Sequence, residues 1–145
     1  MWRLPFPDKC LTDGFGETAG RDTPHRGTDW GKGTAGKGVI AVNDGVIVEN
    51  TWNNVLGWVV VLKVGGWFIG YCHLDAQSML KVGTLVKSGQ RIGTVGNTGS
   101  ASRGSHLHAT LGKTKDSYKI GKVYDLHKYL KTQIAKQDAK KDMTK

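Results

Sequence analysis

Short apolar runs separated by turn formers fill the chain from residue 39 to residue 111. Each run has the length of a β-strand, and together the runs cover residues 39–42, 46–48, 58–62, 67–73, 91–95 and 106–111. Asn43-Asp44-Gly45 separates the first two runs, and Gly65-Gly66 separates the third from the fourth. Because Asp and Gly tolerate the positive φ of tight turns, the pattern predicts two hairpins, over 39–48 and 58–73.

Helical spacing occurs near the C-terminus. The apolar stripe there consists of Leu126, Tyr129, Leu130 and Ile134. Its interval of four predicts a single amphipathic helix from about Val123 to Lys136. Residues 137–145 contain Met143 as their one large apolar side chain, so we expect a basic, disordered tail there.

The chain is therefore expected to hold one domain, residues 1–136, followed by the tail at 137–145. Residues 1–37 are rich in turn formers and are interpreted as loops. The 145 residues include 21 glycines and 3 prolines, which favours a mainly β fold with tight turns over a helical bundle. Cys10 and Cys72 show no CxxC spacing and are interpreted as two separate thiols.

The formal net charge is +9, and the excess is concentrated near the C-terminus. Residues 116–145 carry eight basic and four acidic side chains, against 13 and eight in the first 115. This balance indicates a polyanionic partner, and nucleic acid, an anionic membrane and an acidic cell wall all fit it. The sequence contains no aromatic-basic nucleic-acid motif, and no apolar run long enough for a signal peptide or a membrane span.

Four of the five histidines fall in three glycine-flanked segments. These are His25-Arg-Gly-Thr-Asp29, Tyr71-Cys-His73-Leu74 and His106-Leu-His108. Imidazole and carboxylate groups in this mixture suit zinc, and three protein ligands leave a fourth position for water, as in catalytic zinc sites. The HExxH signature is absent, which excludes that class of metalloprotease.

Strand alternation predicts how these side chains lie. His106 and His108 are two residues apart and should share one face of a strand. The same alternation puts Tyr71 and His73 together and sends Cys72 to the opposite, buried face.

The first motif is expected to bend rather than to form a helix. Pro24 and Gly27 are poor helix formers, so a turn at Arg26-Gly27 would bring His25 and Asp29 onto one ion. The fifth histidine, His127, is interpreted as a solvated residue at the start of the C-terminal helix.

The order of these motifs resembles the lysostaphin-type zinc endopeptidases of peptidoglycan. The matching segments are 25–29, 71–74, 82–93 and 98–108, within a match from about Gly14 to Leu111. The resemblance implies a compact antiparallel β-sheet fold with a groove walled by loops. It also implies hydrolysis of an amide in the stem or cross-bridge peptides of the bacterial cell wall, and hence lysis. Cross-bridge glycines and a D-alanyl–diaminopimelate link both fit such a centre.

The resemblance further implies that His25, Asp29 and His108 bind Zn²⁺. It assigns the chemistry to His106 as general base and His73 as the group that binds the oxyanion, or to the two in exchanged roles.

Some family members hold the oxyanion with a tyrosine shortly before the first histidine. Residues 11–24 contain none, which leaves Tyr71 or Arg26 as substitutes, or no such contribution.

A short catalytic domain that starts at Met1 without a signal peptide resembles a phage endolysin, made in the host cytoplasm and acting on the wall. A segment of a larger wall hydrolase is the alternative. We expect a monomer whose partner is bacterial peptidoglycan, with anionic wall polymers as a further partner of its basic surface.

Three other functions are compatible with parts of the sequence. The first is a catalytically inactive wall-binding or regulatory module of the same fold. Such a module would not need all five of the ligand and catalytic residues that the resemblance implies. A biotin or lipoyl carrier is suggested by residues 82–93, but no Met-Lys or Asp-Lys dipeptide lies near that segment. A nucleic-acid-binding domain rests on charge alone and leaves the histidines unexplained.

Overall fold

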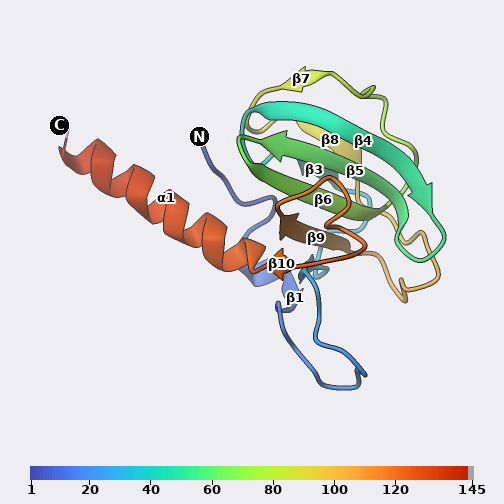
Figure 1. Ribbon diagram of the computed structural model, residues 1–145. Helices are drawn as coiled ribbons and strands as arrows, with labels where there is room; N and C mark the ends of the chain where they lie inside the picture. Colours follow the sequence, from blue (N-terminus) through green and yellow to red (C-terminus); the bar gives the residue numbers. More distant parts are fainter. Residues whose placement is uncertain (144–145) are drawn as a thin grey trace.

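The computed structural model describes residues 1–143 as a mainly β structure with a C-terminal helix (Figure 1). The elements are η1 (Asp8–Cys10), β1 (Leu11–Asp13), β2 (Thr28–Trp30), β3 (Gly38–Ile40), β4 (Gly45–Asn53), β5 (Gly57–Val64), β6 (Trp67–Leu74), β7 (Leu85–Val86), β8 (Arg91–Thr94), β9 (Leu107–Gly112), β10 (Val123–Tyr124) and α1 (Leu126–Met143). Every strand pair among them is antiparallel. The expected fold class is confirmed.

Two sheets of unequal size enclose the main core. The large sheet has the order β1-β2-β9-β6-β5-β4-β7, with β10 added to β9, and the small sheet pairs β3 with β8. Leu107, Leu111 and Ile69 of the large sheet are fully buried in the same cluster as Val39 and Ile92 of the small one. Burial of these side chains is the main force that holds the sheets together.

The other face of the large sheet carries a smaller apolar cluster. It consists of Val59, Val61, Cys72 and Tyr118, with Val48, Leu56 and Phe68 packed against it. Cys72 and Cys10 are both buried free thiols, which confirms the interpretation of two separate cysteines.

One predicted hairpin is confirmed and the other is wrong. β5 and β6 pair across Gly65-Gly66, with Gly65 at φ 57. In contrast, β3 pairs with β8 rather than with β4, so Asn43-Asp44-Gly45 is a crossing between the two sheets. The polar side chains of this turn bind distant segments instead of closing a hairpin: Asn43 Oδ1 accepts from the N-terminal amine and Asp44 Oδ1 from the Ser88 amide.

The segment before residue 38 is more regular than expected. Residues 28–30 form β2, which lies between β1 and β9 in the large sheet and is buried along its whole length. The prediction that residues 1–37 are loops is therefore wrong for these short strands. It fails because such strands are defined by their distant partners rather than by local periodicity.

Helix α1 starts later and ends later than predicted. Asp125 accepts the Lys128 amide through Oδ1 at 3.0 Å, an N-cap that begins the helix at Leu126. Leu126 and Leu130 are buried as the stripe predicts. Residues 137–143 continue the helix where a disordered tail was expected, and positions 144–145 of that prediction lie outside the described residues.

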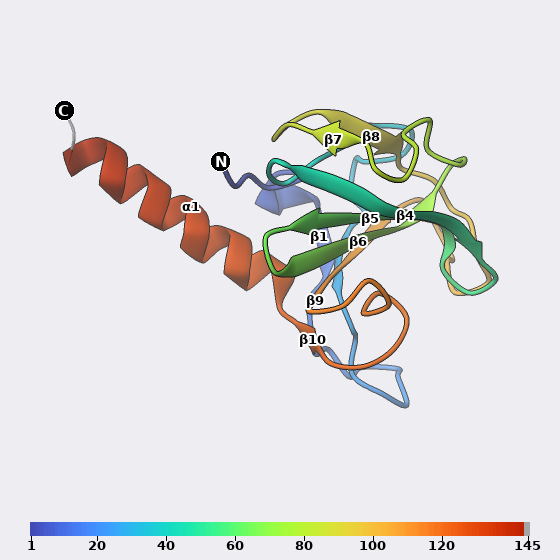
Figure 2. The same cartoon turned by 45° about the horizontal axis from the view of Figure 1, so that its top comes forward.

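Most of α1 projects away from the sheets, as both views show (Figure 2). Gln137 is half-buried and exchanges two hydrogen bonds with the backbone of Trp2, at 2.6 and 3.0 Å. These bonds tie the N-terminal segment to the fourth turn of the helix. Within residues 1–143, no helix combines the length and the apolar character needed to cross a membrane.

A bulge near the end of β6 reverses the predicted direction of His73. Trp58 pairs with Leu74 and Val60 with Tyr71, so Cys72 and His73 together face the single residue Val59. His73 has φ 61, the one positive φ at a residue other than glycine among residues 1–143. The bulge therefore places His73 on the same side as Cys72, and the prediction that His73 shares the face of Tyr71 is wrong.

Gly57, the first residue of β5, is a glycine that the fold requires. Gly57 has φ 72, and a Cβ there would lie 2.1 Å from Oγ1 of Thr98. Thr98 in turn accepts a hydrogen bond from His73 through its carbonyl oxygen, at 2.6 Å. The close approach of the two backbones thus supports the imidazole of His73.

We predict that Gly57→Ala lowers the free energy of unfolding by more than the left-handed conformation alone would cost an alanine, which is about 1–2 kcal/mol. The additional loss arises because the added methyl group displaces Thr98. Urea denaturation measures this change. Gly65→Ala is the control for conformation, because Gly65 also has a positive φ but its Cβ would meet nothing within 4 Å. Gly66→Ala is the control for both effects, because Gly66 has neither a positive φ nor a close neighbour. Equal losses in Gly57→Ala and Gly65→Ala would contradict the role of the close contact.

Candidate metal centre and active site

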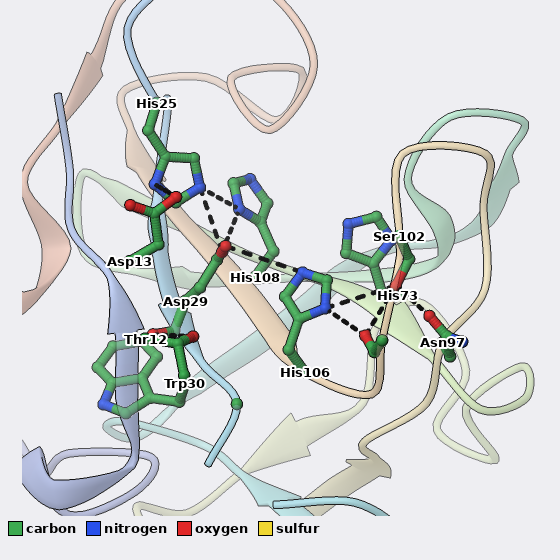
Figure 3. A network of polar contacts seen from close by, with 12 residues as sticks. Thr12, Asp13, His25, Asp29, Trp30, His73, Asn97, Ser102, His106 and His108 are labelled. Carbon is green, nitrogen blue, oxygen red and sulfur yellow. Dashed lines mark hydrogen bonds and ion pairs between the residues drawn. The ribbon is translucent and has the colours of Figure 1, made fainter. Parts of the chain in front are cut away.

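Strands β2 and β9 bring the two outer motifs of the sequence together. Asp29 and His108 are direct cross-strand partners, so their side chains emerge on the same face. Oδ1 of Asp29 lies 2.8 Å from Nδ1 of His108 (Figure 3). His25 precedes β2, and its Nε2 lies 3.2 Å from each of these two atoms.

A bend at Gly27 brings His25 over the start of β2, as expected for a non-helical motif. A Cβ at Gly27 would lie 2.5 Å from the Ala109 carbonyl oxygen and 2.8 Å from Cε1 of His108. Glycine is therefore the residue that allows the His25 segment to lie so close to β9.

The three side chains fit a divalent metal ion. Their ligand atoms all lie within 4.8 Å of one another, and the neighbouring atoms are 2.8–3.2 Å apart. Zinc–ligand bonds of about 2.0–2.1 Å in a tetrahedron require ligand atoms about 3.3 Å apart, close to this triangle. Two imidazoles and one carboxylate are also a common catalytic zinc set, and they are the residues that the sequence predicted.

The three ligand residues perturb one another's protonation. Burial alone would lower the pKa of His25, but the hydrogen bond with Asp29 raises that pKa above its usual value. His25 Nδ1 donates to the Gly14 carbonyl oxygen at 2.9 Å, which leaves the lone pair of Nε2 facing the triangle. Burial alone would raise the pKa of Asp29, but the rings of His108 and His25 beside it hold that pKa well below its usual range. Burial lowers the pKa of His108 and favours its neutral ring.

His106 and His73 lie next to this triangle, and both present Nε2 toward it. His106 Nδ1 donates to the Gly104 carbonyl oxygen at 2.7 Å, and His73 Nδ1 donates to the Thr98 carbonyl oxygen. Nε2 of His106 is 3.9 Å from Oδ2 of Asp29. The ring centroids of His73 and His106 are 4.7 Å apart. The structure thus brings all five predicted site residues together, and it places His106 and His108 on one face as expected.

Thr98 and Gly104 were not assigned roles from the sequence, although both orient a site imidazole through a carbonyl oxygen. Thr98-Gly99 lies within the matching segment 98–108, which was the available signal. No sequence pattern marks Gly104, because a carbonyl acceptor depends on backbone shape and not on residue type.

The two candidate substitutes for the missing tyrosine are engaged elsewhere. Tyr71 is fully buried in the main core, and its hydroxyl accepts from the Val42 amide. Arg26 donates to the carbonyl oxygens of Ser117 and Gly121, at 2.8 and 2.7 Å. Neither side chain is aimed at the site. His127 is also apart from it, because its Nε2 lies 2.9 Å from Oδ1 of Asp8.

Two clefts meet at the metal triangle and form the expected loop-walled groove. The first, of about 660 Å³, is lined by Thr12, Asp13, Ala19, Gly20, Arg21, Asp29, Gly31, Ala101, Arg103, Gly104, Ser105 and His106. The second, of about 570 Å³, is lined by Arg21, Asp22, Thr23, Pro24, His25, Arg26, Asn53, Val55, Leu56, Ala101, His108, Tyr118 and Lys119. Arg21 and Ala101 border both clefts, so an extended chain can run across the histidines from one cleft to the other.

Comparison with known proteins agrees with this geometry. The peptidoglycan DD-endopeptidase ShyC of Vibrio cholerae is 38% identical over 90 residues, which are 61% of this chain and 20% of ShyC. ShyA of the same organism is 39% identical over 92 residues, 63% of this chain and 21% of ShyA. The chain thus spans about a fifth of the length of these curated relatives.

Among solved structures, the catalytic domain of the antimicrobial peptidase lysostaphin from Staphylococcus simulans superposes with a TM-score of 0.71 at 30% identity, covering 83% of this chain and 91% of that domain. The model of Peptidase family M23 matches residues 23–120, a span that contains all five site residues. The chain therefore belongs to peptidase family M23.

Proposed function

We propose that this protein is a zinc-dependent endopeptidase that hydrolyses an amide bond in the stem or cross-bridge peptides of bacterial peptidoglycan. The observation that carries the proposal is the triangle of His25, Asp29 and His108 with two further imidazoles directed toward it. ShyC and ShyA, named as peptidoglycan DD-endopeptidases, support the substrate class. The origin from a phage endolysin and synthesis in a host cytoplasm stay predictions.

Zinc held by His25, Asp29 and His108 would supply a Lewis acid that polarises the scissile carbonyl and acidifies the attacking water. His106 acts as general base and takes the water proton at Nε2. Its Nδ1 is already committed to Gly104, so the ring cannot turn away without losing that hydrogen bond. The same proton can then pass to the leaving amine.

His73 binds the developing oxyanion. Since its Nδ1 donates to Thr98, the ring can reach the oxyanion only through a protonated Nε2. Burial lowers the pKa of His73 to about 4, so the resting ring is neutral. Negative charge that develops on the carbonyl oxygen beside Nε2 favours the uptake of a proton from solvent at this atom. The charged ring then donates a hydrogen bond to the oxyanion as the tetrahedral intermediate develops, and it returns the proton to solvent when the intermediate collapses.

Digestion of purified peptidoglycan tests the activity. We expect new amine termini, detected by mass spectrometry, and no new glycan reducing ends. A chelator should abolish their release and added zinc should restore it. Equal release with and without chelator contradicts zinc dependence, and no release at all favours the inactive wall-binding module.

Two substitutions test the division of roles. We expect His106→Ala to keep stoichiometric zinc while kcat falls by about 10²–10⁴-fold, because it removes the base and no ligand. His108→Ala should lose both zinc and turnover. Metal content is measured by elemental analysis of the purified variants, with His127→Ala as the control histidine outside the site. Loss of zinc in His106→Ala would show that the ligand set is wrong.

We further propose that the basic helix increases affinity for anionic wall polymers. Lys128, Lys136 and Lys140 are exposed along α1, and most of this helix projects from the sheets (Figure 2). Because α1 lines neither cleft, its charges would increase the affinity for the polymer without contacting the reacting groups.

Replacing Lys128, Lys136 and Lys140 together by Gln should weaken binding to a polyphosphate wall polymer at low salt far more than at high salt, because salt screens exposed charges. Co-sedimentation with the polymer measures the loss. The control replaces the exposed residues Lys32, Lys37 and Lys81 by Gln, with the same change in net charge. Equal losses in both variants would refute a specific role of the helix.

A further inference from the structure

One side of the groove contains a cation that the site chemistry does not use. Arg103 lines the first cleft together with Asp29 and His106, so this cleft opens directly onto the reacting groups. The guanidinium of Arg103 is exposed and makes no hydrogen bond or ion pair with any residue in the described part of the chain.

The other charges of this cleft are already paired. Arg21 forms an ion pair with Asp13, and Asp29 belongs to the metal triangle. Among the described residues, Arg103 is therefore the one charged side chain lining this cleft that has no partner within the protein and is free to bind an anionic group. The second cleft differs in its charges, because its lining includes both an acidic residue, Asp22, and a basic residue, Lys119.

The backbone around Arg103 is held in place by the same contacts that orient the general base. Oγ of Ser102 lies 2.5 Å from Oδ1 of Asn97 and 3.1 Å from the Gly104 carbonyl oxygen. That carbonyl oxygen also accepts from Nδ1 of His106. The backbone that carries Arg103 is therefore tied to the same carbonyl oxygen that orients His106.

We propose that Arg103 is a specificity-determining residue that binds a carboxylate of the substrate peptide beside the scissile amide. A planar guanidinium binds a carboxylate through two parallel hydrogen bonds, which fixes orientation as well as charge. The favoured substrates are then stem peptides with a free carboxylate next to the cleaved bond, rather than bridges of glycine alone. This inference rests on the proposed endopeptidase activity.

Two synthetic cross-linked stem peptides, identical except that this carboxylate is free in one and amidated in the other, test the proposal. The zinc-loaded protein should hydrolyse the free form with the higher kcat/KM. Arg103→Gln should reduce that preference about tenfold or more, mainly through a higher KM for the free form, because it removes a charge-assisted hydrogen bond. Arg103→Lys should retain part of the preference. Lys81→Gln, an exposed residue outside both clefts, should retain all of it.

Hydrolysis of both peptides by the wild-type protein without a preference for the free carboxylate overturns the inference and leaves the proposed function standing. An equal loss on both peptides in Arg103→Gln overturns it as well, because Arg103 would then act through the loop and not through a carboxylate. Hydrolysis of neither peptide, when purified peptidoglycan is also not cleaved, overturns the endopeptidase proposal and the inference together.

Discussion

The pairing of β2 with β9 is the constraint on which the site depends. It sets Asp29 directly opposite His108 across two strands whose residues are almost entirely buried, so the two ligands cannot slide without displacing the core. A shift of one residue would turn every side chain of β2 to the other face. The rest of the site is built around this fixed pair: His25 enters through the bend before β2, and His106 precedes β9 by one residue. The geometry of the candidate metal site is thus a consequence of sheet register.

Local spacing made some of these features predictable and left others hidden. The spacing of His106 and His108 predicted their shared face, because alternation within one strand is a local property. The direction of His73 was predicted wrongly, since it depends on a bulge that is defined only by the pairing of β6 with β5. The same reason explains Asn43-Asp44-Gly45, which has the residue types of a hairpin turn but joins two sheets. The motif order identified the ligands through resemblance to a family, whereas the acceptors Thr98 and Gly104 became visible only with the backbone in place.

Burial and polar contacts have different effects on the imidazoles of this site. Burial lowers the pKa of His73 and of His108, which favours the neutral form of both rings. Carbonyl acceptors then select one tautomer for His73 and for His106, which directs both Nε2 atoms inward. The loops that supply these acceptors also wall the groove. The short segment 97–106 therefore both orients the two imidazoles and contributes to the wall of the groove.

The position of Arg26 between His25 and Asp29 has a mechanical consequence. Its guanidinium donates to the carbonyl oxygens of Ser117 and Gly121, which ties the segment that carries two of the candidate metal ligands to the loop after β9. Ordering of that loop and occupancy of the metal site become linked equilibria: whatever stabilises one stabilises the other. Hydrogen exchange in residues 113–122 would consequently slow when metal binds, although none of these residues is a ligand. The exchange rate of this loop would therefore indicate whether the metal site is occupied.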